Sequence, residues 1–300
     1  MVKNTMKIIE CFMNQSSWLK QETRKIRPMG VLWHSTGANN TNIKRYVQPD
    51  DNAANRDELI SIIGKNRYSN DWNHIDRDAG VSFFIGTLND GSVGVVQCGP
   101  DNLRQWGCGG SLNNTHIQFE ICESALSNES YFKKVYEQAI ELTAYLCEKY
   151  GLDPLGSFTY NGKTVPVITD HAGSYSLGMG SNHGDVGHWF RRYLGNDYLN
   201  KIRQDVKNKM QGGCGEMGCP YWNGSKCTKD TPKIDDTLHV GDTVKMDVNA
   251  TVYGRTYRFA SWVYNATLYV REISGNRIVV STLRTGAITG AVDKKYLKKV

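Results

Sequence analysis

A break in composition near residue 211 constrains the fold most, because it divides the 300-residue chain into two segments of different character. From Gln211 to Lys233 the sequence is rich in Gly, Cys, Asn, Thr and Pro, which favour turns and loops over packed elements. A helical pattern precedes this stretch and β-type sequence follows it. The chain therefore predicts two domains, at 1–210 and 237–300, joined by a linker at 211–236.

The segment before the break alternates between short apolar runs and longer helical patterns. Its runs of strand type are residues 29–33, 81–85, 92–96, 116–122 and 165–168. Asn89-Asp-Gly91 lies between two of these runs, which indicates a hairpin. Apolar residues recur at helical spacing from Tyr131 to Tyr150 and Gly151 follows them, which predicts a helix, with a second one at 185–210. Strands mixed with helices of this length predict an α/β fold, in which helices cover a sheet.

The segment after the break has β-type sequence only. Residues 240–245, 267–272 and 277–282 alternate or run apolar, and Ser274-Gly-Asn276 provides a hairpin turn between two of them. Residues 291–297 close the segment. This pattern predicts a small all-β barrel.

Bulk composition describes an ordinary globular protein, with 39% hydrophobic and 22% charged residues. No window approaches the roughly 18 consecutive apolar residues of a membrane span. The N-terminus is basic, but Glu10 and Asn14 interrupt the apolar stretch after it, which makes a poor signal-peptide core. We therefore expect synthesis in the cytoplasm and, for any action outside the cell, release without a cleavable signal.

The net charge of +6 has two possible interpretations. It reflects either a solvated surface with a slight excess of Lys, or attraction to a polyanion through the long-range field. The sequence contains no Lys/Arg-rich run with interleaved aromatic residues and no nucleic-acid-binding motif. Among polyanions, the anionic bacterial wall is therefore a better candidate partner than nucleic acid.

The eight cysteines do not form the framework of a disulfide-rich secreted domain. Three of them, Cys214, Cys219 and Cys227, cluster in the polar stretch, but no fourth ligand follows at a standard metal-site spacing. A reduced, reactive surface cluster is favoured there over a structural metal. The other five lie in apolar surroundings and are expected to be small buried residues: Cys11, Cys98, Cys108, Cys122 and Cys147.

Five ionisable residues have contexts that suggest chemistry. His34 and His171 each follow an apolar run, and His183 and Asp185 lie two apart in a Gly/Ser/Asn loop. Two histidines and an aspartate are a usual protein ligand set of a catalytic zinc, which keeps its fourth position open. Glu120, in an apolar run, would then be a base that the metal does not need as a ligand. Two alternatives stay open, because His183 could be a fourth ligand and Asp185 could cap a helix.

The motifs around these residues resemble a known family. They are Leu32-Trp-His-Ser-Thr-Gly37, the segment 108–122, Asp170-His171 and Ser181-Asn-His-Gly-Asp-Val-Gly-His-Trp189. In this order they resemble the zinc-dependent N-acetylmuramoyl-L-alanine amidases of the phage-lysozyme and peptidoglycan-recognition type, and most of all the endolysins of phages that infect Firmicutes. The resemblance covers residues 1–210 and implies a central mixed sheet flanked by helices. It also implies cleavage of the amide between N-acetylmuramic acid and L-alanine in bacterial peptidoglycan.

The resemblance assigns a role to each candidate residue. His34, His171 and Asp185 match the zinc ligands, and Glu120 matches the acidic residue that activates the attacking water. His183 stands where the family has a cationic residue that stabilises the tetrahedral intermediate. The resemblance therefore favours this role for His183 over that of a fourth ligand. The remaining histidines are read as structural.

Two positions depart from the family pattern. Relatives often have His after the tryptophan that corresponds to Trp106, whereas this chain has Gly107. Some relatives also carry a tyrosine in the strand before the hairpin, and Val81-Ser-Phe-Phe84 has none. A contact to substrate or transition state is therefore absent here or supplied by another residue.

The C-terminal segment resembles the SH3-type wall-binding domains of such endolysins, on the evidence of Val240-Gly-Asp242, Ala260-Ser-Trp-Val263, Leu268-Tyr-Val-Arg271 and residues 285–292. This resemblance makes the aromatic residues Trp262, Tyr264 and Tyr269 candidates for stacking on sugar or peptide, although a core role is favoured for any one of them.

Two other functions compete with the amidase. A non-catalytic peptidoglycan-recognition protein would lack a metal ligand, and the intact set of His34, His171 and Asp185 argues against it. A glycosidase needs paired carboxylates. Glu120 and Glu123, three apart on one predicted strand, should point to opposite faces, which disfavours that reading.

Overall fold

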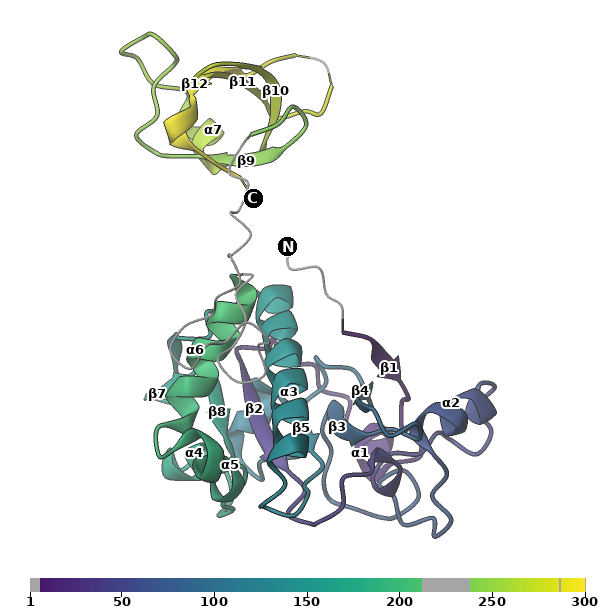
Figure 1. Ribbon diagram of the computed structural model, residues 1–300. Helices are drawn as coiled ribbons and strands as arrows, with labels where there is room; N and C mark the ends of the chain where they lie inside the picture. The colour runs from purple at the N-terminus through teal and green to yellow at the C-terminus, as the bar shows by residue number, and fades with distance from the viewer. Residues whose placement is uncertain (1–5, 212–237, 286, 300) are drawn as a thin grey trace. The chain divides into compact units, whose positions relative to one another are not determined.

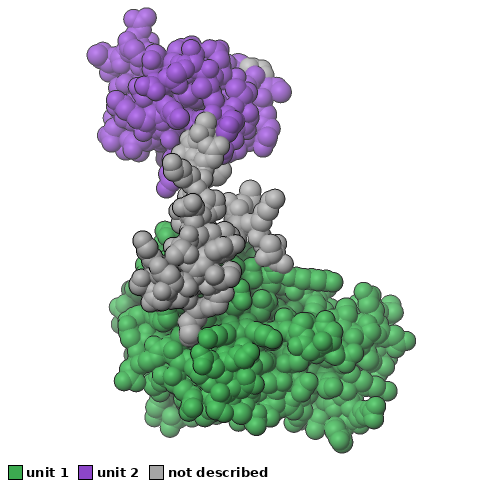
Figure 2. Space-filling model, in the orientation of Figure 1, with its two compact units in different colours: residues 1–229 green, residues 230–300 purple. Residues whose placement is uncertain are grey.

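The computed structural model describes residues 6–211, 238–285 and 287–299 (Figure 1). The chain divides into two compact units, Met1–Lys229 and Asp230–Val300 (Figure 2). Their point of division lies outside the described residues, so the predicted domain bounds stay a prediction. The cysteine cluster of Cys214, Cys219 and Cys227 also lies outside the described residues.

A six-stranded mixed sheet forms the centre of the first unit. Its strands are β1 (Ile8–Glu10), β4 (Val93–Gln97), β3 (Phe83–Thr87), β5 (His116–Ile121), β2 (Gly30–Ser35) and β8 (Ile168–Asp170), in that spatial order. Strands β3 and β4 pair antiparallel around the predicted hairpin turn, and the other neighbours pair parallel. The carboxyl ends of β2, β5 and β8 therefore meet at one edge of the sheet.

Alternation along β2 and β5 separates the two faces of this sheet. Trp33 and Phe119 are register partners, and both are fully buried in the hydrophobic cluster that includes the helices of the first unit. The residues that follow them, His34 and Glu120, are the next register pair and point to the opposite face. Hence one face of these strands packs the core and the other carries polar side chains.

Helix α3 (Glu129–Tyr150) covers the core face. It contacts β2, β3 and β4 and packs beside α6 (Tyr198–Met210), as Figure 1 shows. The Asn128 side chain caps its first turn, and Gly151 ends it in a left-handed conformation with φ of 65°. The predicted helix at 185–210 is wrong in one respect: it is two helices, α5 (Gly187–Leu194) and α6, because the chain turns at Gly195, whose φ is 78°.

The remaining elements of the first unit are short. The single strand predicted at 165–168 is divided between two strands, because a two-stranded hairpin of β6 (Ser157–Tyr160) and β7 (Lys163–Pro166) precedes β8. The short helices are α1 (Ser17–Gln21), α2 (Arg56–Ile63) and α4 (His171–Ser176), with 3-10 turns η1 (Ile43–Arg45) and η2 (Ser111–Asn114). The five cysteines predicted to be buried are buried and free.

The second unit contains a five-stranded antiparallel sheet of order β12-β11-β10-β9-β13. Its elements are β9 (Thr243–Met246), α7 (Ser261–Asn265), β10 (Leu268–Ser274), β11 (Arg277–Ser281), β12 (Gly290–Asp293), the 3-10 turn η3 (Lys294–Tyr296) and β13 (Leu297–Lys299). The sheet curls around its own apolar core, which includes Val244, Val270 and Val280 (Figure 1). Among the described residues of the chain, no helix has the length and apolar character needed to cross a bilayer.

Candidate metal centre

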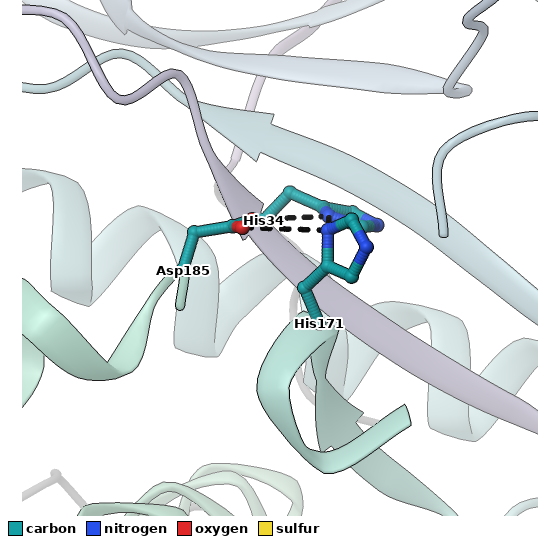
Figure 3. A group of neighbouring side chains, drawn as sticks. All are labelled: His34, His171 and Asp185. Carbon is teal, nitrogen blue, oxygen red and sulfur yellow. Dashed lines mark hydrogen bonds and ion pairs between the residues drawn. The ribbon is translucent and has the colours of Figure 1, made fainter. Parts of the chain in front are cut away.

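Three side chains converge at the edge of the sheet where its parallel strands end. His34 lies near the end of β2, and His171 opens α4 directly after β8. Asp185 comes from the loop before α5 and approaches both rings from the other side (Figure 3). The parallel pairing of β2 with β8 brings the two histidines together from positions 137 residues apart.

The distances between the donor atoms fit a tetrahedral ion. His34 Nδ1 lies 3.1 Å from His171 Nδ1 and 3.2 Å from Asp185 Oδ2, and His171 Nδ1 lies 3.3 Å from Asp185 Oδ1. Zinc binds nitrogen and oxygen at about 2.0–2.1 Å, so the edges of its ligand tetrahedron measure about 3.3–3.4 Å. The Asp185 carboxylate meets His34 through Oδ2 and His171 through Oδ1, so two imidazole nitrogens and a carboxylate lie at the spacing of neighbouring zinc ligands.

Asp185 is ready to act as an anionic ligand. Burial alone would raise the pKa of its carboxyl, but the favourable interactions of the carboxylate with the His171 and His34 rings outweigh burial and hold the pKa well below its usual value. The carboxyl is therefore ionised throughout the neutral range. A buried anion beside two imidazoles attracts a cation more strongly than the same group in water would.

The opposite edges of both imidazoles are held by side chains that the sequence analysis missed. Gln118 Oε1 lies 2.8 Å from His34 Nε2, and Ser181 Oγ lies 3.0 Å from His171 Nε2. Partners of this kind orient ligand histidines in metal sites and fix which nitrogen carries the proton. The only sequence signal for Gln118 was a polar residue in the middle of an apolar run.

A cavity of about 800 Å³ opens over the three donors. Glu120 lines it from β5, and one carboxylate oxygen, Oε2, is buried without a hydrogen-bond partner. Burial raises the pKa of Glu120 well above its usual value, the charges of Asp185 and Glu123 raise it further, and Arg77 opposes them. A carboxyl with a raised pKa holds a proton more readily than an exposed one, which suits a side chain that takes up a proton and returns it.

His183 lines the same cavity but lies beside the donor group and not within it. Its Nδ1 is 3.1 Å from Ser181 Oγ, and its ring centre is 4.5 Å from that of His171. The alternative in which Asp185 caps a helix is wrong, because Val186 is the N-cap of α5 and no side chain caps it. Asp185 is thereby free to face the two histidines.

Sequence comparison decides the family. Residues 23–187, more than half of the chain, match the family described as N-acetylmuramoyl-L-alanine amidase. The chain belongs to this family. It is therefore a peptidoglycan hydrolase that cleaves the amide between N-acetylmuramic acid and the L-alanine of the stem peptide.

Solved structures of low sequence identity are similar to this amidase. The hydrolase AmiA of Staphylococcus aureus is 20% identical, with 70% of this chain and 90% of that chain covered and a TM-score of 0.41. The PlyG catalytic domain is 18% identical, with coverage of 68% and 96% and a TM-score of 0.41. An endolysin amidase of Clostridium intestinale, LysCS, is 20% identical, with coverage of 56% and 83% and a TM-score of 0.33. A comparison with curated proteins found no match.

The amidase has a second carboxylate near the cleft, and its contacts are structural. Strand β5 ends at Ile121, so the prediction that Glu123 shares the strand of Glu120 is wrong. Glu123 is buried and accepts hydrogen bonds from Ser35 Oγ at 2.6 Å and from the Gly37 backbone N–H at 3.1 Å. A carboxylate engaged in this way holds the end of β2 in place, which removes the support for a glycosidase pair.

Two further residues line the cavity without having been predicted. Tyr46 enters from the end of η1 and stacks on Phe84, with ring centres 5.8 Å apart. Arg77 also lines the cavity, over the ring of Trp72. The strand before the hairpin lacks the tyrosine that some relatives carry there. Tyr46, from a different segment, stacks on this strand at Phe84.

The three aromatic candidates of the second unit differ in exposure. Trp262 is 57% exposed, whereas Tyr269 is half-buried beneath the Arg284 guanidinium, 4.7 Å from its ring centre. The Tyr264 hydroxyl accepts a hydrogen bond from the Phe259 backbone N–H and donates one to the Ala250 carbonyl. Tyr264 therefore fits the core role, and Trp262 fits a contact surface best.

Proposed function

We propose that this amidase is zinc-dependent and that His34, His171 and Asp185 hold the ion. The observation that carries the proposal is the convergence of two imidazole nitrogens and the Asp185 carboxylate, with 3.1 to 3.3 Å between neighbouring donor atoms. The chemistry of the set supports zinc, since imidazole and carboxylate with one open position are typical of zinc hydrolases. When bound, zinc supplies Lewis acidity, which polarises the scissile carbonyl and makes water a stronger acid.

Glu120 acts as the general base and then as the general acid. Its carboxyl, which lines the cleft, accepts a proton from the attacking water as the carbon–oxygen bond forms. The protonated carboxyl then gives a proton to the alanine nitrogen as the carbon–nitrogen bond breaks. Proton transfer by a positioned side chain contributes about 10²–10⁴ in rate.

His183 donates a hydrogen bond to the developing oxyanion. It lies on the wall of the cleft next to His171, and its Nδ1 lies 3.1 Å from Ser181 Oγ. A donor aimed at the charge that develops in the transition state contributes about 3–4 kcal/mol.

We further propose that the chain works as an endolysin of a phage or prophage of Firmicutes, made in the cytoplasm and acting on the wall after release. The second unit would then be an SH3-type domain, at residues 237–300, that binds the wall. The sequence resemblance of both segments supports this assignment, as does the antiparallel five-stranded architecture of the second unit. The moderately basic charge suits an anionic wall better than nucleic acid.

Metal content and product chemistry test the proposal. Purified protein should contain one zinc per chain, lose activity in EDTA and regain it with zinc. Digested wall should contain free muramoyl lactyl groups and new L-alanine amino termini. Protein without zinc, or activity that survives EDTA, would contradict the metal role, and new reducing ends would indicate a glycosidase. A non-catalytic wall-binding protein, the rival function, would give no clearing band in a zymogram.

A further inference from the structure

A chain of hydrogen bonds runs behind His34, on the side away from the other two metal donors. His34 Nε2 lies 2.8 Å from Gln118 Oε1, and Gln118 Nε2 lies 2.8 Å from Asn113 Oδ1. The Cys108 backbone N–H lies 3.1 Å from the same Asn113 oxygen. His34, Gln118 and Asn113 are all buried, so water does not compete for these bonds.

The direction of every bond in this chain follows from its last member. A backbone N–H can only donate, so the Asn113 atom that meets Cys108 must be the carbonyl oxygen. The Gln118 atom that faces that oxygen must then be the amide nitrogen, which turns the Gln118 oxygen toward His34. An amide carbonyl oxygen can only accept a hydrogen bond. His34 therefore carries its proton on Nε2 and leaves the Nδ1 lone pair free.

Asp185 competes for the same proton. Its Oδ2 lies 3.2 Å from His34 Nδ1 and would accept a hydrogen bond from a proton on that atom. A proton on Nδ1 would occupy the position that a metal needs. The acceptor at Gln118 therefore decides which nitrogen of His34 keeps the lone pair that a metal needs.

Gly107 makes the room for this arrangement. A Cβ at position 107 would lie 2.4 Å from Gln118 Oε1, 2.9 Å from Val81 Cγ1 and 3.1 Å from His34 Nε2. The backbone of Gly107 is not in the left-handed region, so the conformation does not require glycine. Space alone requires it.

We propose that Gly107 and Gln118 act as a pair that positions His34: Gly107 admits the Gln118 amide, and Gln118 sets the His34 proton on Nε2 so that Nδ1 faces the metal. The inference rests on the proposed metal role of His34. A side chain at position 107 would displace the Gln118 oxygen, because even its Cβ would lie 2.4 Å from that atom. Both residues are positioning residues, since they act through His34 and are not among the converging donors.

Nitrogen NMR of the metal-free protein tests the pair without catalysis. In the wild type, at a pH where His34 is neutral, the ring should carry its proton on Nε2. Gln118→Met removes the acceptor and should move the proton to Nδ1, whereas Gln118→Glu retains an acceptor and should restore the Nε2 form. An unchanged tautomer in Gln118→Met would overturn the proposal. Because no metal is present, this result is independent of whether zinc is the cofactor.

Zinc affinity, measured by competition with a chelator, gives the second readout. Loss of an outer hydrogen-bond partner typically weakens metal binding by about 10–100-fold. Gln118→Met and Gly107→Ala should each lower zinc affinity by a factor in this range. The double variant should bind zinc as tightly as the weaker-binding single variant, because both substitutions act through one hydrogen bond. Losses that multiply in the double variant would contradict the pairing. A wild type that does not bind zinc would instead contradict the proposed function.

A matched control separates the pair from general effects of the substitutions. Gln204 is exposed on α6 and bonds to Asn208, so Gln204→Met should leave the tautomer and zinc affinity unchanged. If Gln118→Met does not fold, Gly107→Ala and Gln118→Glu still test the proposal. Normal tautomer and affinity in Gly107→Ala would then overturn it.

Discussion

His34 and Glu120 are register partners on the neighbouring parallel strands β2 and β5. Partners on adjacent strands point to the same face, so the proposed ligand and the proposed base share one side of the sheet. The pair before them, Trp33 and Phe119, points to the other side and packs the core. A slip of one residue in β5 would bury Glu120 in that core, so the packing of Phe119 indirectly places the base.

Substitution of the base should separate metal binding from turnover. Glu120→Gln preserves the shape of the side chain but cannot accept the proton, so kcat should fall by about 10²–10⁴. Zinc content should remain at the wild-type level, because Glu120 is not among the three converging donors. Amidase kinetics with metal analysis of the same sample check both points.

The control for this substitution is Glu137→Gln, an exposed glutamate on α3. It removes the same charge from the exposed side of the helix that covers the opposite face of the sheet, and it should keep wild-type kcat. Full activity in Glu120→Gln would remove Glu120 from the mechanism.

Loss of one ligand should remove the response of stability to zinc. A ligand that binds only the folded state stabilises it by about 2.7 kcal/mol at a concentration 100 times its Kd. EDTA should therefore lower the Tm of the wild type. Asp185→Ala, which removes the one carboxylate of the set, should melt at the same temperature with and without EDTA. A wild-type Tm that does not change when EDTA is added would argue against a metal at this site.

The sequence predicted the metal candidates because each one interrupts or ends a pattern. His34 and His171 follow apolar runs that became β2 and β8, and strand ends at one sheet edge are where side chains meet. The pattern could not supply Gln118, because the partner of a buried amide depends on packing between segments. The pattern could not predict the role of Gly107 either, since a glycine in open space and a tightly packed glycine look the same in sequence.

Short elements were the main omissions in the fold. The β6–β7 hairpin has a turn signal, Asn161-Gly162, but its strands of four residues show little apolar alternation. The single helix predicted at 185–210 overlooked Gly195, whose left-handed conformation separates α5 from α6. Periodicity detects long amphipathic segments well, and local backbone conformations override it at single residues.

Acid should destabilise the fold through His116. Burial lowers the pKa of this fully buried histidine from 6.5 to about 4, although the Pro166 carbonyl, which accepts a hydrogen bond from Nε2, opposes the shift. The folded state thus favours neutral His116. Its contribution to stability is complete above pH 6.5 and is lost as the pH falls toward 4, by up to about 3 kcal/mol. Urea unfolding across this range should show the decline, and His116→Gln should reduce its slope.

Two aromatic substitutions in the second unit should have opposite consequences. Trp262→Ala truncates a side chain that is 57% exposed, so it should weaken binding to purified wall and leave the Tm nearly unchanged. Tyr264→Phe removes a hydroxyl that bonds to Phe259 N–H and the Ala250 carbonyl, so it should cost about 1 kcal/mol of stability and leave wall binding intact. Pull-down on wall fragments and thermal unfolding measure the two effects. If Trp262→Ala binds wall as the wild type does, the contact surface lies elsewhere on the unit, because Tyr264 is held by the backbone and Tyr269 is half-buried under Arg284.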